Sequence, residues 1–232
     1  MNILFNSVYD IGIVGRLIVL TLIALSIIAW GIIIEKIVIF SRSRRESAKF
    51  FTLFQTYSDW RNIEKETRQF RHSPFLNLFR KIFAETKNEA FSRPPFEENE
   101  DNEKQVTPIS YYKSLADSVI STEMMQYEKR LVFLSSTVSA SPFLGLFGTV
   151  WGVMQAFMSI GIKGSAAITA IGPGIAEALI TTVAGLAVAI PVLFAYNLIV
   201  DKIRKYENQM QILANDMIKK IVRENIHGGS QI

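Results

Sequence analysis

Three long uncharged runs dominate the hydrophobic pattern of the chain. The first, 17–34, holds 18 residues, which at about 1.5 Å per residue just crosses a hydrocarbon core of about 30 Å. The second, 131–162, and the third, 164–200, are longer than one crossing needs, and only Glu177 interrupts the third. The pattern therefore predicts three membrane-spanning helices, two of which extend beyond the bilayer or tilt within it.

A cleaved signal peptide is the alternative interpretation of the first run. Such a peptide has a basic segment before its apolar region and a small-residue cleavage site after it. Here the basic cluster of Arg42, Arg44 and Arg45 follows the run, and no such site comes after it. We therefore interpret the first run as a retained helix.

The placement of Lys and Arg predicts the orientation of the spans. The segment 36–130 contains 17 of these residues and the tail 202–223 contains six, whereas Arg16 and Lys163 are the two that remain. The positive-inside rule then puts the long loop and the tail in the cytoplasm. The predicted division is an outer N-terminus (1–16), a first span (17–36), a cytoplasmic helical loop (37–130) with a flexible 91–108 segment, a second span (131–162), an outer hairpin (163–171), a third span (172–200) and a cytoplasmic C-terminal helix and tail (201–232).

The parts outside the spans also carry helical patterns. Ser73 and Pro74 form a helix start, and five apolar residues follow at helical spacing: Phe75, Leu78, Phe79, Ile82 and Phe83. After Pro108 the apolar spacing predicts a helix that runs straight into the second span. The tail carries an apolar stripe that packs either on the loop helices of the same chain or between subunits: Ile203, Tyr206, Met210, Leu213 and Met217.

Composition excludes several classes of protein. Apolar residues make up 49% of the chain and charged residues 20%, a balance that excludes a disordered protein. The chain has no cysteine and its two histidines lie far apart, so we expect no disulfide scaffold, no metal centre and no bound cofactor. No clustered Ser/His/Asp set and no phosphate-binding glycine loop is visible, and we therefore expect no enzyme.

A net charge of +4 raises the question of nucleic acid. The basic residues flank the spans, where membrane topology and anionic lipid already explain them, so we expect a lipid bilayer and no nucleic acid as partner. They are Lys36, Arg42, Arg44, Arg45, Lys129, Arg130, Lys202, Arg204 and Lys205.

Small and polar residues line the second and third runs. The hairpin tip lies near 165–166, so residues of the two helices whose numbers sum to about 331 share a depth in the membrane. This places Thr149 level with Thr182, and Glu177 a turn or so nearer the tip. A membrane carboxyl beside two level hydroxyls suits proton or ion passage, although each threonine could instead bond its own helix and Glu177 could reach the interface. The remaining small residues suit close helix packing: Ser141, Gly145, Gly148, Gly152, Thr181 and Gly185.

Two stretches closely resemble the TolQ/ExbB proton-channel family, relatives of MotA. They are SPFLGLFGTVWGVMQAF (141–157) and PGIAEALITTVAGLAVAIPVLFAYN (173–197). The resemblance implies a cation-conducting subunit of the bacterial inner membrane, with a periplasmic N-terminus and a cytoplasmic C-terminus. It also implies an all-α homo-oligomer, a pentamer around two copies of a single-span TolR/ExbD-type partner, which acts on a TolA/TonB-type protein.

The same resemblance implies roles for particular residues. Thr149, Glu177 and Thr182 match the family's functional threonines and glutamate, and Thr181 is a weaker match. The length and short N-terminus favour the TolQ branch, which maintains the outer envelope and its constriction at division in the Tol–Pal system. The ExbB branch, which energises TonB-dependent uptake, and a non-conducting membrane scaffold remain the alternatives.

Overall fold

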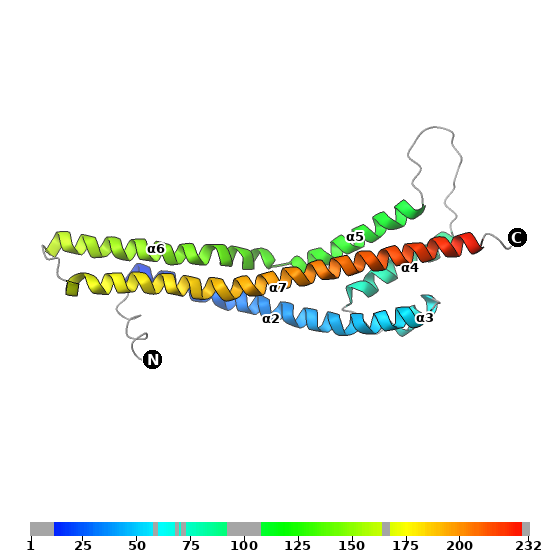
Figure 1. Cartoon of the computed structure of the whole chain (residues 1–232), viewed down its shortest axis with the longest axis horizontal. Helices are drawn as coiled ribbons and strands as arrows, with labels where there is room; N and C mark the ends of the chain where they lie inside the picture. The colour runs from blue at the N-terminus through cyan, green and yellow to red at the C-terminus, as the bar shows by residue number, and fades with distance from the viewer. Residues whose placement is uncertain are drawn as a thin grey trace, which may run out of the picture. The chain divides into compact units, whose positions relative to one another are not determined.

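All regular structure in the described part of the chain is α-helix. The computed structural model describes residues 12–57, 60–67, 70, 73–91, 108–163 and 168–228. Three helices are long and apolar enough to cross a membrane, as predicted, and they are α2, α6 and α7. In chain order the helices are α2 (Ile13–Thr56), α3 (Trp60–Glu66), α4 (Pro74–Phe91), α5 (Pro108–Glu128), α6 (Leu131–Lys163) and α7 (Ile168–Gly228) (Figure 1).

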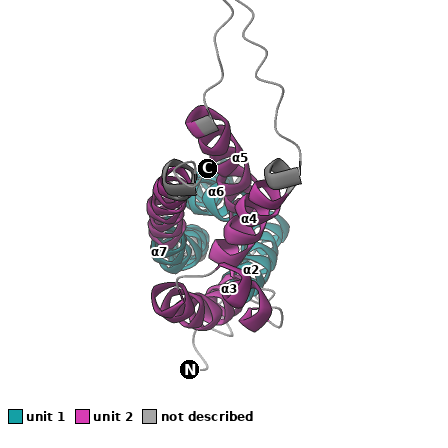
Figure 2. Cartoon of the chain, turned by 90° about the vertical axis from the view of Figure 1, so that its right-hand side faces the viewer, with its two compact units in different colours: residues 1–35, 130–200 teal, residues 36–129, 201–232 magenta. Residues whose placement is uncertain are grey.

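The chain forms two compact units, which Figure 2 shows in different colours. Unit 1 comprises Met1–Glu35 and Arg130–Val200, and unit 2 comprises Lys36–Lys129 and Asp201–Ile232. The helices α2 and α7 each contribute one part to each unit. The units differ in which side chains they bury.

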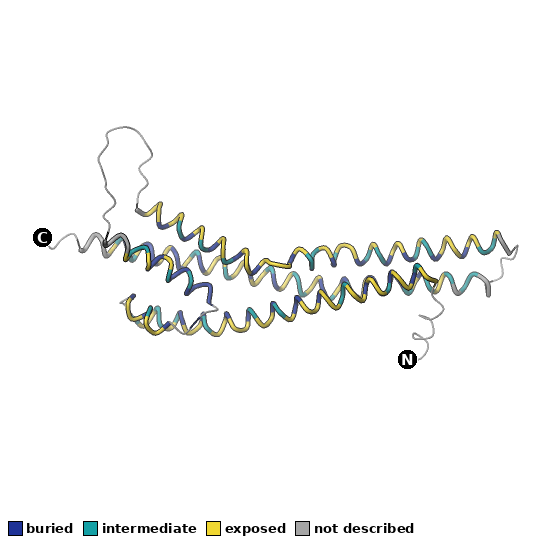
Figure 3. The backbone as a smooth tube through the Cα atoms, turned by 180° about the vertical axis from the view of Figure 1, so that it is seen from behind, coloured by how far each residue is buried: buried dark blue, intermediate teal, exposed yellow. Residues whose placement is uncertain are grey.

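Unit 1 exposes apolar side chains and buries small polar ones. Figure 3 colours the backbone by the burial of each residue. Phe143 is 70% exposed and Phe194 is 68% exposed, whereas Ser141, Thr137 and Thr181 are buried. This is the reverse of the distribution in a water-soluble domain. The surface of unit 1 is therefore suited to lipid or to other apolar helices.

Unit 2 has a conventional aromatic core. The five apolar positions predicted for the loop helix are all buried, and α4 begins at Pro74 after Ser73 as expected. The ring of Phe79 lies 5.8 Å from the rings of Phe50 and Trp60 and 5.6 Å from that of Phe83, measured between centroids. Most of the predicted flexible segment, 92–107, lies outside the described residues.

The apolar stripe of the tail packs within its own unit. Ile203, Met210, Leu213 and Met217 are buried in unit 2. The Tyr206 ring stacks on that of Phe40 at a centroid distance of 5.6 Å, and it contacts the rings of Phe75 and Tyr127 at 5.7 and 6.0 Å with their planes inclined to it. Of the two alternatives for this stripe, packing on the loop helices of the same chain is the one observed.

The prediction of one continuous helix into the second span is wrong. The helix α5 ends at Glu128, α6 begins at Leu131, and Arg130 between them has a left-handed backbone with φ 67°. Such a residue ends a helix, and it is usually glycine because a side chain there costs about 1–2 kcal/mol. In unit 1 the Arg130 guanidinium forms an ion pair with Glu35 across the chain, a contact that no local sequence pattern reveals.

Lys36, one of the basic residues that we attributed to membrane topology and anionic lipid, has a partner inside the protein. Lys36 is 2% exposed, and its ammonium donates a hydrogen bond of 2.5 Å to the backbone carbonyl of Tyr127. That carbonyl lies in the last turn of α5, where backbone acceptors have no partner within the helix and a cation is favourable. Lys36 thus stabilises the C-terminal end of α5 inside unit 2.

Burial shifts two titratable groups of α5 in the same direction. It raises the pKa of Tyr127 to about 12, although the tyrosine hydroxyl donates to Ser43 at 3.2 Å. It also raises the pKa of the Glu123 carboxyl, and the hydrogen bond of 3.1 Å from Asn77 offsets part of that shift. The ionised form of Glu123 is therefore disfavoured in the folded unit.

We expect Arg130→Gly to be more stable than Arg130→Ala by about 1 kcal/mol. Both variants lose the ion pair with Glu35, but only glycine adopts the left-handed backbone without steric cost. Thermal unfolding of the purified protein in detergent, followed by circular dichroism, measures the difference. An alanine variant as stable as the glycine variant would contradict the left-handed turn.

We expect Glu123→Gln to stabilise the protein at neutral pH. A carboxyl whose folded pKa lies above the unfolded value of 4.5 favours folding below that value and loses this contribution as the pH rises through the folded pKa. The stability that Glu123→Gln gains over the wild type should therefore shrink as the pH falls toward about 4. Asn77→Ala removes the hydrogen bond that favours the ionised carboxyl, so this variant should be less stable than the wild type at neutral pH. Unfolding curves of the wild type and both variants at several pH values test this, and parallel pH profiles would contradict it.

Candidate functional site

Glycines allow α6 and α7 to approach closely in unit 1. A Cβ atom added to Gly145 would lie 2.8 Å from the Thr181 backbone oxygen, and one on Gly185 would lie 2.5 Å from the Ser141 backbone oxygen. At Gly152 the added atom would lie 2.9 Å from the Ala178 side chain. The small residues that the sequence singled out for packing therefore lie in a contact between two helices of the same chain.

Thr181 occupies the space over Gly148. A Cβ added to Gly148 would lie 2.6 Å from the Cβ of Thr181, whose side chain is fully buried. The Thr181 hydroxyl lies 2.7 Å from the Ala178 carbonyl and 3.3 Å from the Gly145 carbonyl, so backbone acceptors already satisfy it. Thr181 is accordingly a packing residue in this arrangement.

Thr182 and Thr149 meet across the two helices, as the depth count predicted. Their hydroxyl oxygens lie 3.4 Å apart, and the Thr182 hydroxyl also lies 3.1 Å from the Gly145 carbonyl. The Thr149 hydroxyl donates to the Leu146 carbonyl at 2.7 Å, within its own helix. Because a hydroxyl has one proton and two lone pairs, Thr149 can accept from Thr182 while it donates to Leu146.

The hydroxyl of Thr149 is accessible from outside the chain. Thr149 lines a shallow hollow on the exposed side of α6, together with Val150, Val153 and Met154. The rest of that lining is apolar, so the hollow suits a helix of another chain better than a polar ligand. A group carried on such a helix could reach the Thr149–Thr182 pair.

Glu177 belongs to a different contact. One of its carboxylate oxygens accepts a hydrogen bond of 2.8 Å from the backbone N–H of Gly12, the residue before α2. At 3.6 residues per turn, Glu177 and Thr182 lie about 140° apart around α7, so they do not share a face. Glu177 and the threonine pair therefore make separate contacts, and the sequence did not predict the one with Gly12.

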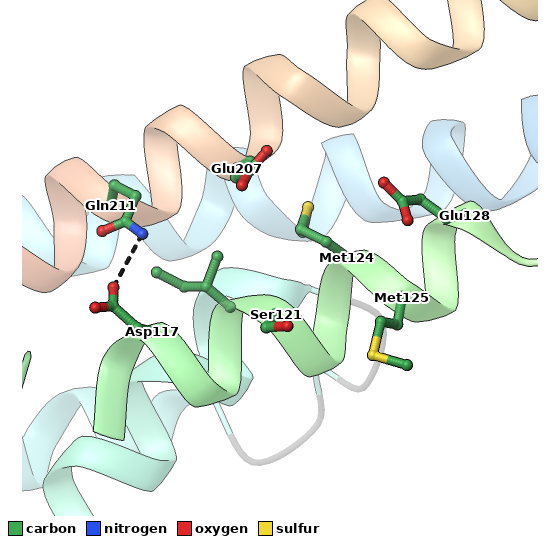
Figure 4. A pocket seen from close by; sticks show the side chains of 8 residues that line it. Asp117, Ser121, Met124, Met125, Glu128, Glu207 and Gln211 are labelled. Atoms are coloured by element: carbon green, nitrogen blue, oxygen red, sulfur yellow. Dashed lines mark hydrogen bonds between the residues drawn. The ribbon is translucent and has the colours of Figure 1, made fainter. Parts of the chain in front are cut away.

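Unit 2 contains a second hollow, a groove between α5 and α7 that Figure 4 shows from close by. The Gln211 amide donates to the Asp117 carboxylate at 3.1 Å across one end of it. Among the described residues, no three acidic, histidine or cysteine side chains lie close enough together to hold a metal ion. The groove is lined by Asp117, Ile120, Ser121, Met124, Met125, Glu128, Glu207 and Gln211.

Comparison with known proteins identifies the family. Residues 79–212 match the model of the MotA/TolQ/ExbB proton channel family. The chain belongs to this family. The matched range contains the α6–α7 contact with both threonines and Glu177, which confirms the resemblance drawn from the two sequence stretches.

Relatives within the MotA/TolQ/ExbB family come from both branches. The chain is 35% identical over 191 residues to the Tol-Pal system protein TolQ of Haemophilus influenzae, covering 80% of this chain and 78% of the relative. It is 34% identical over 201 residues to that of Pseudomonas aeruginosa, covering 84% and 81%. The biopolymer transport protein ExbB of Xanthomonas campestris pv. campestris is 30% identical over 185 residues, covering 79% and 72%.

We expect Gly148→Ala to destabilise the α6–α7 contact by about 1–3 kcal/mol, because the added methyl group collides with Thr181. Gly161→Ala is the matched control: it lies in the same helix, and its added Cβ meets nothing within 4 Å. The control should be neutral or stabilising by up to about 1 kcal/mol, because alanine favours a helix over glycine. Unfolding by denaturing detergent measures both, and equal stability of the two variants would contradict the close approach.

Proposed function

We propose that the chain is a TolQ-type subunit of the bacterial inner membrane. With a single-span TolR/ExbD-type partner it converts the proton motive force into mechanical work on the cell envelope, in the Tol–Pal system that maintains outer-membrane integrity and supports division. Family membership and the two TolQ relatives, each matched over at least 80% of this chain, support this assignment. Protons are the coupling ion, and no bound cofactor is needed.

The proposed assembly is a pentamer around two partner helices, and it acts on a TolA-type protein. The apolar exposed surface of unit 1 supports such an assembly, since lipid and further helices are the surroundings that suit it. The excess of Lys and Arg in the loop and tail supports a cytoplasmic unit 2 and C-terminus and a periplasmic N-terminus.

The Thr149–Thr182 pair is the observation that carries the proposal. The Thr182 proton has two acceptors, the Gly145 carbonyl at 3.1 Å and the Thr149 hydroxyl at 3.4 Å. A small rotation of the hydroxyl exchanges them. When the Thr182 oxygen takes up a proton, the Thr182 hydroxyl passes its own proton to the Thr149 oxygen, and Thr149 releases the proton that it now directs at the Leu146 carbonyl to an acceptor on the partner helix. The transmembrane potential supplies about 2.3 kcal/mol per elementary charge per 100 mV, which is enough for one proton to bias a helix rearrangement.

An ExbB-type role in TonB-dependent uptake is the second candidate. The Xanthomonas ExbB relative, matched over 79% of this chain, favours it. The biophysical task is the same in both branches, and only the partner and the pathway differ. Expression in two deletion strains, one lacking tolQ and one lacking exbB, separates them, and rescue of detergent resistance in the first strain is the result we expect.

Removal of either hydroxyl should abolish energy transduction and leave assembly intact. Thr149→Val and Thr182→Val keep the side-chain shape and lose the hydroxyl, whereas Thr149→Ser and Thr182→Ser keep it and serve as controls. We expect the valine variants to lose detergent resistance by at least tenfold in a plating assay and the serine variants to retain most of it. Co-purification of the partner from the same cells verifies assembly.

Full rescue by both valine variants would overturn the conducting role. The non-conducting scaffold would then be the better explanation, because a scaffold needs the partner contact but no hydroxyl pair. Loss of partner co-purification in the valine variants would instead place the hydroxyls in the assembly contact.

A further inference from the structure

Among the described residues, neither Gly12 nor the first turn of α2 offers a side chain that caps the start of this first membrane helix. The carbonyl of Gly12 accepts the N–H of Arg16 at 3.0 Å, which makes Gly12 the N-cap residue of α2. Gly12 has no side chain to bond the following N–H groups, and Gly15, at the third helical position, cannot return a carboxylate as in a capping box. The first turn of α2 also contains no acidic residue.

Glu177 supplies the missing acceptor from a position 165 residues away. Its Oε1 atom lies 2.8 Å from the Gly12 nitrogen, and both carboxylate oxygens lie within 4 Å of the position that a Gly12 Cβ would take. A helix N-terminus carries about half a positive charge, and a hydrogen bond to an ionised acceptor is about twice as strong as one between neutral groups. The contact is therefore strongest when Glu177 is ionised.

The charged groups on the packed helices of unit 1 are few. On α2 they are Arg16, one turn beyond Gly12, and Glu35 at the other end of the unit; α6 contributes Lys163 at its end and none between Leu131 and Ile162. Among the described contacts, the Gly12 N–H is the hydrogen-bond partner that the structure gives Glu177 at the start of another helix.

We propose that Glu177 is a positioning residue that holds the start of the first membrane helix against α7, and that its protonation loosens this contact. The inference rests on the proposed function for the source of the proton. A proton that reaches Glu177 removes the charge that the α2 terminus stabilises, while the neutral Thr149–Thr182 contact between α6 and α7 is unchanged. The response to the proton is then a movement of α2.

The test measures the separation of α2 and α7 in the full-length chain, co-purified with its partner in detergent. Because this chain contains no cysteine, two introduced cysteines are the only attachment sites for spin labels on it. Ile13→Cys and Leu179→Cys place the labels at exposed positions beside Gly12 and Glu177. Dipolar broadening in electron paramagnetic resonance then reports the distance between them.

Two substitutions at Gly12 isolate the hydrogen bond. Gly12→Pro removes the donor N–H and leaves Glu177 intact, whereas Gly12→Ala keeps the N–H and puts its Cβ at an ordinary contact distance of 3.4 Å from Oε1. We expect a longer and broader distance distribution for Gly12→Pro and for Glu177→Gln, and an unchanged one for Gly12→Ala.

A Gly12→Pro distribution identical to that of Gly12→Ala would overturn the inference, and so would a Glu177→Gln distribution identical to that of the wild type. If one variant fails to assemble, the other comparison decides the question, whether it is Gly12→Pro against Gly12→Ala or Glu177→Gln against the wild type. Failure of the proposed function has a different signature, because the threonine valine variants would then rescue the deletion strain while the spin-label distances still respond to Gly12→Pro.

Discussion

The close approach of α6 and α7 is the constraint on which the rest of unit 1 depends. Because Gly145, Gly148 and Gly185 have no side chains, the two backbones come near enough for Thr182 to reach both the Gly145 carbonyl and the Thr149 hydroxyl. That contact fixes the rotation of α7 about its own axis. At about 100° per residue, Glu177 must then point about 140° away from Thr182, which is where it meets the start of α2.

The two units of the chain bury opposite kinds of side chain. In unit 1 the helices pack through small and polar residues and expose large apolar ones, as expected where lipid replaces water. In unit 2 the aromatic side chains are inside, and a buried lysine is tolerated because the carbonyl of Tyr127 accepts its hydrogen bond. The turn at Lys129–Arg130, where α5 ends and α6 has yet to begin, falls where one pattern changes to the other.

Sequence reasoning succeeded where a property depends on periodicity or counting. The three apolar runs, the start of α4 at Pro74 and the equal depth of Thr149 and Thr182 follow from helix geometry alone. It failed where a distant partner decides the outcome. Arg130 adopts a left-handed backbone at the end of a helix, where glycine is usual, so the local sequence gives no sign of the break. Its ion-pair partner, Glu35, lies 95 residues away in the sequence. Lys36 follows an apolar run, as basic residues at the end of a membrane span do, yet it is buried because the Tyr127 carbonyl, 91 residues away, accepts its hydrogen bond.

The two polar contacts of α7 differ in how they respond to charge. The contact with α6 joins neutral hydroxyls and carbonyls, so a change in protonation nearby alters it little. The contact with α2 joins a carboxylate to a helix N-terminus, and its strength depends directly on whether the carboxylate is ionised. Under the proposed function, α6 and α7 therefore form the fixed pair that carries the threonines, and α2 is the element whose position a proton on α7 can change. Gly15 at the third helical position makes this possible, since a Glu or Gln there would return a side-chain acceptor to the Gly12 N–H and remove its dependence on Glu177.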